Sequence, residues 1–320
     1  MPKISIIIPV YGVEKYIDRC ARSLFNQTFE SIEYIFVDDC TRDKSIEILE
    51  DVIKEYPSRA PYIRILHHSV NKGLPQARRT GVLAAKGDYI LHCDSDDWLE
   101  PDTCELLYNN ASEHNSDVVV CDIEQTDGSK SLRIIKGAYT EDKTPFITNM
   151  MYMKTTWSLV NKLFRRDVYN VVKQYPEANI SEDMALCLQL IQGCSKISYV
   201  NKPLYKYFVN MSSMSQVMTE EKILNNYRQC KSNVDLVVDF YSDHVIDSNI
   251  KAALEYVKFH CGLKLWGLCR DRSYLKMWME SYPHIWRKIF RNKNISLLFK
   301  LKLCLTYLGL YPRTKDCIIH

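Results

Sequence analysis

Glycine is scarce in this chain, with 10 in 320 residues, and none of them forms the G-x-G-x-x-G or G-x-x-x-x-G-K-S/T patterns that bind nucleotide phosphates. A bound phosphate would therefore have to be held by something other than a glycine-rich loop. The 12 cysteines include no C-x-x-C pair and follow no secretory leader, so we expect reduced, cytoplasmic thiols rather than disulfides or a zinc site. The histidines form no metal-binding pattern, no serine has the surroundings of a hydrolase nucleophile, and no apolar run reaches the about 20 residues of a membrane span.

The charge is distributed unevenly along the chain. Residues 251–320 carry 14 Lys and Arg against 4 Asp and Glu, a net charge of +10, which leaves −7 for residues 1–250 out of the total of +3. A basic and apolar end suits an anionic surface, and an acidic front concentrates carboxylates where chemistry could occur. Nucleic-acid binding is not expected, because the lysines lie among apolar residues without aromatic stacking platforms.

Hydrophobic patterning predicts an α/β fold of the Rossmann-like, doubly wound kind with a mainly parallel sheet. Expected strands cover residues 4–10, 34–37, 62–66, 88–93 and 117–121, and expected helices cover 15–25, 45–56, 76–85 and 101–114. Residues 126–129 predict a turn between two strands at the sheet edge. After Thr219 only helical patterns remain, so we expect a catalytic domain at 1–218 and a helical region at 219–320.

Ligands of an open α/β sheet bind beyond the carboxyl ends of its strands. Three expected strands end in Tyr11, in Asp38-Asp39 and in the acidic run 94–97. Carboxylates crowded at one edge repel each other, and a hard divalent cation, Mn²⁺ or Mg²⁺, is the simplest remedy. The alternative is that residues 94–97 cap the helix expected from Pro101.

A series of motifs in this order and spacing resembles the family-2 glycosyltransferases, which have the GT-A fold. The motifs are Ile6-Ile7-Ile8-Pro9-Val10-Tyr11, Val37-Asp38-Asp39 with Asp43, Asn71-x-Gly73, Ala77-Arg78, Gly81, Ala85-x-Gly87-Asp88-Tyr89-Ile90 and Asp94-Ser95-Asp96-Asp97. The resemblance covers about residues 3–210.

The resemblance implies metal-dependent, inverting transfer of a sugar from a nucleoside-diphosphate donor, expected to be a UDP-sugar. Tyr11 would stack near the nucleobase, Asp39 would hydrogen-bond the base, and Asp94 would contact the ribose. Asp96 would hold the metal, and Arg78 would lie near the acids and the diphosphate. Taken alone, Tyr11 also fits a core tyrosine, Asp39 a helix cap and Arg78 a surface cation. The donor-binding set that we predict is Pro9, Tyr11, Glu14, Asp39, Arg78, Asp94 and Ser95.

Further motifs similar to the family's lie at Trp157 with 161–165 and at 181–186. An inverting displacement needs a base that takes the proton of the acceptor hydroxyl, and the resemblance assigns this role to Asp183. Ser181 looks like an N-cap, and a helix N-terminus would lower the basicity of Asp183, which a desolvated pocket could offset. Alternatively, Glu182 and Asp183 only favour a helix start. Residues 203–207 and 212–215 resemble the stretch that closes over the donor in the family.

The chain departs from the family's pattern at Gly12, at Cys40 and at Arg79. Cys40 replaces a glycine, so we expect a remodelled loop. The apolar stretch 295–308, interrupted by Lys300 and Lys302, predicts a helix lying in a membrane interface. We therefore expect a glycan or lipid-linked glycan acceptor of surface polysaccharide synthesis and a location at the inner face of the plasma membrane, the alternative being a helical lid packed on the catalytic domain. Competing hypotheses are a sugar nucleotidyltransferase and an inactive nucleotide-sugar-binding protein.

Overall fold

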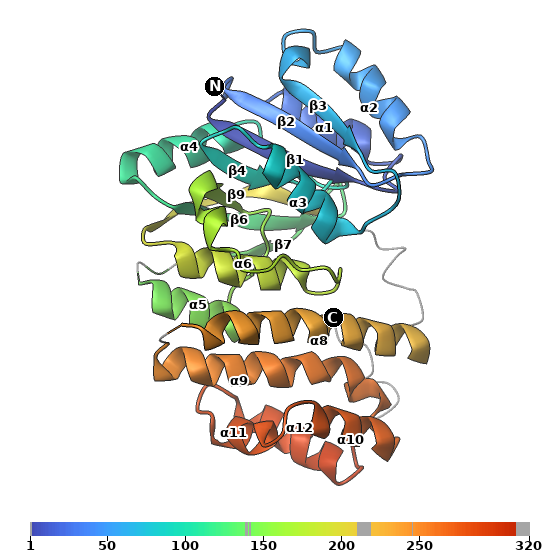
Figure 1. The fold of residues 1–320 in the computed structure, drawn as a ribbon, viewed down its shortest axis with the longest axis vertical. Coiled ribbons are helices and arrows are strands. Elements are labelled where there is room, and N and C mark those ends of the chain that lie inside the picture. The colour runs from blue at the N-terminus through green and yellow to red at the C-terminus, as the bar shows by residue number, and fades with distance from the viewer. Residues whose placement is uncertain (1, 138–139, 141, 210–218, 245, 312–320) are drawn as a thin grey trace.

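The computed structural model describes residues 2–137, 140, 142–209, 219–244 and 246–311. A nine-stranded sheet has the order β3-β2-β1-β4-β8-β6-β9-β5, with β7 paired to β6. Its strands are β1 (Ile4–Val10), β2 (Ile32–Asp38), β3 (Ile63–His67), β4 (Tyr89–His92), β5 (Trp98–Leu99), β6 (Val118–Thr126), β7 (Ser131–Ile135), β8 (Lys162–Arg165) and β9 (Ile197–Phe208). Figure 1 shows the sheet at one end of the molecule and a stack of helices at the other.

The helices that pack on the sheet belong to two different hydrophobic clusters. One cluster includes α1 (Ile17–Phe25), α2 (Ser45–Lys54) and α4 (Thr103–His114). The other includes α3 (Leu74–Ala84), α5 (Lys143–Met151) and α6 (Glu182–Gly193). The expected doubly wound arrangement is confirmed, and the predicted helix ends differ from these bounds by at most two residues.

Strand β1 is buried on both faces, as its continuous apolar run predicts. Ile6 and Ile8 belong to the α1 side, and Ile7 belongs to the α3 side. Helix α3 approaches Ile7 closely because Gly81 has no side chain, since a Cβ there would lie 2.3 Å from Ile7 Cγ2. The close approach fixes α3 beside the carboxyl edge of the sheet.

The sheet is mixed: β3-β2-β1-β4 is parallel throughout, and β6 also pairs in parallel with β9, so the expected parallel arrangement holds for these four pairings. Among the described residues, four of the eight strand pairings are antiparallel: β4 with β8, β6 with β8, β6 with β7 and β5 with β9. The predicted turn at 126–129 joins β6 and β7, as expected. Antiparallel strands arise here because the later strands are joined by a hairpin and by long excursions rather than by regular β-α-β crossovers.

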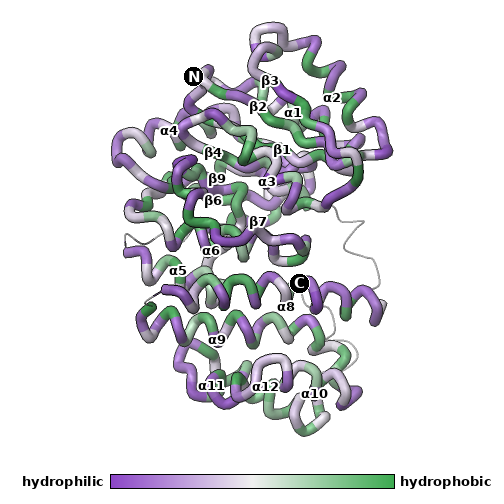
Figure 2. The backbone as a smooth tube through the Cα atoms, viewed as in Figure 1, coloured by the Kyte–Doolittle hydropathy of each residue, from purple (hydrophilic) through white to green (hydrophobic). Residues whose placement is uncertain are grey.

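The described residues from Glu220 onward are mainly helical, as predicted. They form α8 (Glu220–Ser242), α9 (Ser248–Gly262), α10 (Arg272–Ser281), α11 (Ile285–Arg291) and α12 (Leu297–Tyr307). Helix α8 packs on α6 and α9 packs on α5, so one core runs from the sheet into this region. Figure 2 shows hydrophobic and hydrophilic stretches alternating along α8 and α9, as expected for helices buried on one side. None of the helices in the described ranges is long and apolar enough to span a membrane.

Candidate functional site

A cavity of about 540 Å³ opens at the carboxyl ends of β1, β2 and β4. Six of the predicted site residues line it together: Pro9, Tyr11, Asp39, Asp94, Ser95 and Asp96. Its size suits a small-molecule ligand. The tyrosine is 52% exposed, so it is not a core residue, and it offers a free aromatic face at the cavity rim.

Asn179 also lines the cavity and is a residue that sequence reasoning missed. Its side-chain oxygen accepts a hydrogen bond from the backbone N–H of Leu74 at 3.1 Å, across 105 residues of sequence. Gly73, with φ of 86°, makes this contact feasible, because a Cβ there would lie 2.8 Å from the same oxygen. No local signal marks Asn179, since its role depends on a contact between distant segments.

Arg78 is buried behind the cavity rather than lining it. Its Nη2 donates to Asp94 Oδ1 at 2.8 Å, and its Nε donates to Glu182 Oε1 at 2.9 Å. Burial disfavours the guanidinium charge, but the two carboxylates outweigh burial, so the pKa of Arg78 is raised. The surface-cation alternative for Arg78 is therefore wrong, and this side chain joins the end of β4 to the start of α6.

Arg78 and Glu182 each keep a buried polar atom without a hydrogen-bond partner in the described structure. These atoms are Nη1 of Arg78 and Oε2 of Glu182. Buried polar atoms in native proteins are usually satisfied by protein, water or ligand. Nη1 of Arg78 is therefore a buried donor that none of the described residues uses.

The acidic run after β4 is built into the fold and does not cap a helix. The helix α4 starts only at Thr103, and its N-cap residue is Asp102, so the capping alternative is wrong. Burial, followed by the charges of Asp94 and Asp96, raises the pKa of Asp97 to about 8. Asp97 accepts hydrogen bonds from the Tyr205 hydroxyl at 2.6 Å and from the Phe208 backbone at 2.7 Å.

Asp96 lines the cavity with Asp94. Burial raises the pKa of Asp96, and the charge of Asp94 raises it further. On the other side, Arg19 Nη2 donates to the backbone oxygen of Asp96 at 2.8 Å, and its guanidinium lies 3.8 Å from the ring centroid of Trp98. Arg19 therefore holds the loop after β4 in place, while the Asp96 carboxylate remains next to the negative charge of Asp94.

These acids suit a hard divalent cation that binds together with a ligand. Among the described residues no group of three or more His, Cys, Asp and Glu side chains could hold a metal by itself. Mg²⁺ and Mn²⁺ do not need such a group when phosphate oxygens complete their coordination, since one or two carboxylates then suffice. Asp94 and Asp96 supply such carboxylates, and a cation would relieve their mutual repulsion.

Asp39 is held by the loop that precedes α3. Its carboxylate accepts hydrogen bonds from the backbone N–H groups of Lys72 and Gly73, both at 2.8 Å, and lies 2.7 Å from His68 Nδ1. Asp39 is therefore not the N-cap residue of a helix, and it fixes the cavity wall. Cys40 adopts φ of 59°, so the backbone angle that the replaced glycine favours is kept in spite of the side chain.

Glu14 lies beside the cavity but does not line it. Its carboxylate accepts a hydrogen bond from the Lys44 backbone at 3.2 Å, and its own N–H donates to Asp43 at 3.0 Å. Glu14 therefore joins the β1–α1 loop to the start of α2. The closing motif predicted at 212–215 lies outside the described residues.

Asp183 follows Glu182 at the start of α6 and is partly buried. Burial raises the pKa of Asp183, and it outweighs the lowering by the Met184 backbone N–H and by Arg78. Ser181 occupies the N-cap position with φ of 65°, but its side chain makes no capping bond and donates to Cys230 Sγ instead. The expected capping by Ser181 is thus wrong, because the left-handed backbone turns its hydroxyl toward α8.

Lys162 of β8 places a fixed positive charge near Asp183. It is fully buried, and its Nζ donates to the carbonyl oxygen of Ser158 at 2.7 Å and to Asn161 Oδ1 at 2.9 Å. Burial lowers the pKa of Lys162. The sequence motif at 161–165 therefore contributes structure and a nearby charge to the surroundings of Asp183.

Comparisons with known proteins agree with this geometry. Residues 5–170 match the family model "Glycosyl transferase family 2". The chain is 32% identical over 223 residues to the putative glycosyltransferase EpsH of Bacillus subtilis, a match that covers 67% of this chain and 63% of EpsH. The chain thus spans less than two thirds of the length of this relative.

Two solved structures share the fold. The crystal structure of S. aureus TarS 1–349 in complex with UDP superposes with a TM-score of 0.68 at 20% identity and covers 96% of this chain and 88% of that one. The mannosyltransferase PcManGT of Pyrobaculum calidifontis, in complex with GDP-Man and Mn²⁺, gives 0.57 at 13% identity over 98% and 82% of the two chains. The predicted GT-A fold is confirmed, and the chain belongs to glycosyltransferase family 2.

Proposed function

We propose that this protein is an inverting, metal-dependent glycosyltransferase that moves a sugar from a nucleoside-diphosphate sugar, a UDP-sugar, to a glycan acceptor. The observation that carries the proposal is the buried Arg78, which bridges Asp94 at the cavity and Glu182 at the start of α6. The bridge brings a cavity suited to a donor next to a carboxylate suited to a base.

The donor nucleotide would bind in the cavity of about 540 Å³. The exposed ring of Tyr11 can stack on the nucleobase, and Asp39, whose carboxylate is already oriented by the α3 loop, can accept from the base. Asp94, which lines the same cavity, would contact the ribose. Arg78, which pairs with Asp94 from behind the cavity, would add positive charge near the diphosphate.

A divalent cation, Mn²⁺ or Mg²⁺, would be held by Asp96 with support from Asp94. The cation would supply positive charge that stabilises the departing diphosphate. PcManGT is described with Mn²⁺, and the repulsion between Asp94 and Asp96 favours a cation here as well.

Asp183 is the proposed base. An inverting displacement needs a carboxylate that accepts the proton of the acceptor hydroxyl as that oxygen attacks the sugar carbon. The raised pKa of Asp183, caused mainly by burial, makes it a stronger base than an exposed aspartate. Glu182 cannot serve equally, because its Oε1 accepts from Arg78.

The acceptor is proposed to be a glycan or lipid-linked glycan of the cell surface, reached from an anionic membrane. Helix α12 packs one face through Leu303 and Thr306 and exposes Leu297, Leu298 and Leu301. Basic residues at 287, 288, 291 and 293 precede it. This arrangement is typical of a helix that lies in the membrane interface, so residues 219–320 would form a helical, membrane-associating region attached to a catalytic domain at 1–218.

The transfer reaction is tested by incubating the purified protein with nucleotide sugars, Mn²⁺ or Mg²⁺ and acceptor glycans, and by measuring nucleoside-diphosphate release. Wild type should release UDP, whereas Asp96→Asn and Asp183→Asn should each lose at least about 100-fold in kcat. Glu50→Gln, an exposed carboxylate on α2 outside the assigned site, is the control and should keep the activity of wild type. Full activity in both aspartate variants would refute the assigned roles, and pyrophosphate release from a nucleoside triphosphate would favour a nucleotidyltransferase.

Membrane association is tested separately by co-sedimentation with vesicles. Wild type should bind phosphatidylglycerol vesicles more than phosphatidylcholine vesicles, and Leu297→Asp with Leu298→Asp should abolish the difference. Leu83→Asp, an equally exposed leucine on α3, is the control. Equal binding of wild type and of the α12 variant would contradict the proposal for this region.

A further inference from the structure

A second and larger cavity lies at the opposite edge of the sheet from the donor cavity. It measures about 770 Å³ and lies at the start of β4, beside Asp88 and Tyr89. Asp94 follows the end of the same strand. The second cavity is therefore a separate site, and the residues assigned to donor binding and catalysis take no part in it.

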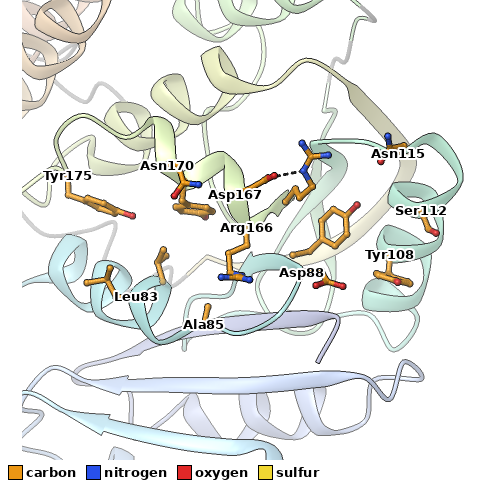
Figure 3. A pocket seen from close by; sticks show the side chains of 14 residues that line it. Leu83, Ala85, Asp88, Tyr108, Ser112, Asn115, Arg166, Asp167, Asn170 and Tyr175 are labelled. Carbon is orange, nitrogen blue, oxygen red and sulfur yellow. Dashed lines mark hydrogen bonds and ion pairs between the residues drawn. The ribbon is translucent and has the colours of Figure 1, made fainter. Parts of the chain in front are cut away.

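The walls of this pocket are aromatic. Four tyrosines line it: Tyr108 and Tyr175 are half-buried, whereas Tyr89 and Tyr169 are buried behind the pocket wall. Figure 3 shows Tyr108 and Tyr175 at opposite ends of the pocket with Arg166 between them. Tyrosine rings provide flat apolar faces with a hydroxyl at the edge, which is the surface that the C–H face and the hydroxyl rim of a sugar ring can match.

Polar and charged side chains complete the lining of the pocket. Asn115, Asn170, Ser112 and Asp88 line it together with Arg166. Arg166 uses Nε to donate to the backbone oxygen of Gly87 at 2.7 Å, which fixes the guanidinium in the pocket. Its terminal nitrogens form no ion pair among the residues that the structure describes, so they remain available for ligand hydroxyls.

The charges in and behind the pocket nearly cancel. Arg165 pairs with Asp117 at 2.6 Å and with Asp167 at 2.8 Å. Asp88 pairs with Lys3 at 2.9 Å. A site for a phosphate chain would instead gather several uncompensated cations. The balance therefore favours a neutral ligand that is rich in hydroxyl groups.

Helix α3 contributes residues to both the second pocket and the donor cavity. Ala77 of α3 lines the donor cavity and Leu83 lines the second pocket, so their separation along the helix is about 9 Å. The segment 175–179 runs beside α3, since Gln76 Nε2 donates to the Pro176 carbonyl. Arg79, a departure from the family's pattern, lies over the ring of Tyr175 at 5.2 Å. A ligand several sugar units long could reach from one cavity to the other.

We propose that this second pocket binds a neutral segment of a glycan chain, away from the reacting end, by stacking on Tyr108 and Tyr175 and by hydrogen bonds from Arg166. Binding of an oligosaccharide here does not depend on catalysis. The statement that the bound chain is the acceptor rests on the proposed function, and it makes this pocket a second contact for long acceptors.

The binding test uses neutral mono-, tri- and hexasaccharides of hexose and N-acetylhexosamine as probes, with calorimetry in saturating UDP and Mn²⁺. The hexasaccharide should bind wild type, and Arg166→Gln and Leu83→Glu should each weaken binding about ten-fold or more. Arg133→Gln, the same change at an exposed arginine of β7, should bind as wild type does, and all variants should keep the same UDP affinity. Leu83 is 74% exposed, so its substitution should leave the fold intact.

The proposal is overturned if no probe binds wild type, or if both pocket variants bind the hexasaccharide as tightly as wild type. Preferential binding of inorganic tripolyphosphate at Arg166 would also overturn it, in favour of an anion site. In transfer assays, Arg166→Gln should raise KM for long acceptors and leave KM for monosaccharide acceptors unchanged. Equal changes for both would refute the acceptor assignment, whereas absence of transfer in wild type would refute the proposed function and leave the binding result standing.

Discussion

Replacing Arg78 with methionine is expected to destabilise the protein strongly and to do so more at high pH. The guanidinium is buried between Asp94 and Glu182, and breaking a buried ion pair by removing one partner costs about 3–5 kcal/mol. Most of this cost should come from Glu182, because Asp94 keeps 30% of its side chain exposed and water can screen it. The melting temperature should therefore fall by on the order of 10 °C at pH 8.

The pH dependence follows from Glu182. Burial raises its pKa to about 7 while Arg78 lowers it, so the variant should have a still higher pKa. A carboxyl whose folded pKa lies above its unfolded value stabilises the fold at low pH, and this contribution is lost as pH rises through the folded pKa. The difference in melting temperature between wild type and variant should consequently shrink from pH 8 to pH 5.

Differential scanning fluorimetry across this pH range measures the effect. The control is Arg79→Met, the exposed neighbour on α3, which should change the melting temperature by a few degrees at most. The double variant Arg78→Met with Glu182→Gln should recover part of the loss, because it removes the orphaned carboxylate. A loss that is equal at pH 5 and pH 8, or a double variant no more stable than the single one, would refute this account of the bridge.

Three further outcomes follow from the site and its supports. Burial raises the pKa of Asp183, so kcat should fall on the acid side of the pH profile, at a pH above the ordinary pKa range of aspartate. Asp183→Asn should lack this acid-side fall. If the fall persists in Asp183→Asn, another group causes it. Cys40→Gly should stabilise the fold by about 1 kcal/mol in thermal melts, because Cys40 has φ of 59°, and no gain would contradict strain at this turn. Gly81→Ala should destabilise the fold by about 1–3 kcal/mol in the same assay, since the new Cβ would lie 2.3 Å from Ile7 Cγ2. Leu83→Ala, at an exposed position of the same helix, is the control. Equal melting temperatures of the two variants would contradict the close packing at Gly81.

The first hundred residues could be predicted well because their signals are local. The apolar run of β1 and the amphipathic pattern of α1 each reflect burial within a β-α-β unit, where consecutive elements are neighbours. The carboxyl ends of parallel strands lie at the same edge of the sheet. Tyr11, Asp39 and Asp94 could therefore be placed at one edge without knowledge of the tertiary structure. Helix ends shifted by one or two residues because caps and fraying decide them.

The antiparallel half could not be predicted in the same way. Strand β8 has four residues, and it is a strand because it pairs with β4 on one side and with β6 on the other. Strand β5 has two residues and depends on β9. Such short elements have little periodicity of their own, and pairing with distant strands determines them.

The same limit explains which functional contacts remained hidden. The motif that contains Arg78 and the motif that contains Glu182 were each visible, but the hydrogen bond between them spans 104 residues. Strand order creates it: β4 pairs with β8 and β8 with β6, while Tyr205 of β9 donates to Asp97 after β4. The later segments are thereby drawn against the acidic end of β4. Residues such as Asn179 reach the site only because these distant segments lie against each other. Substituting Asn179 should therefore change the geometry of the site, although no sequence motif marks this residue.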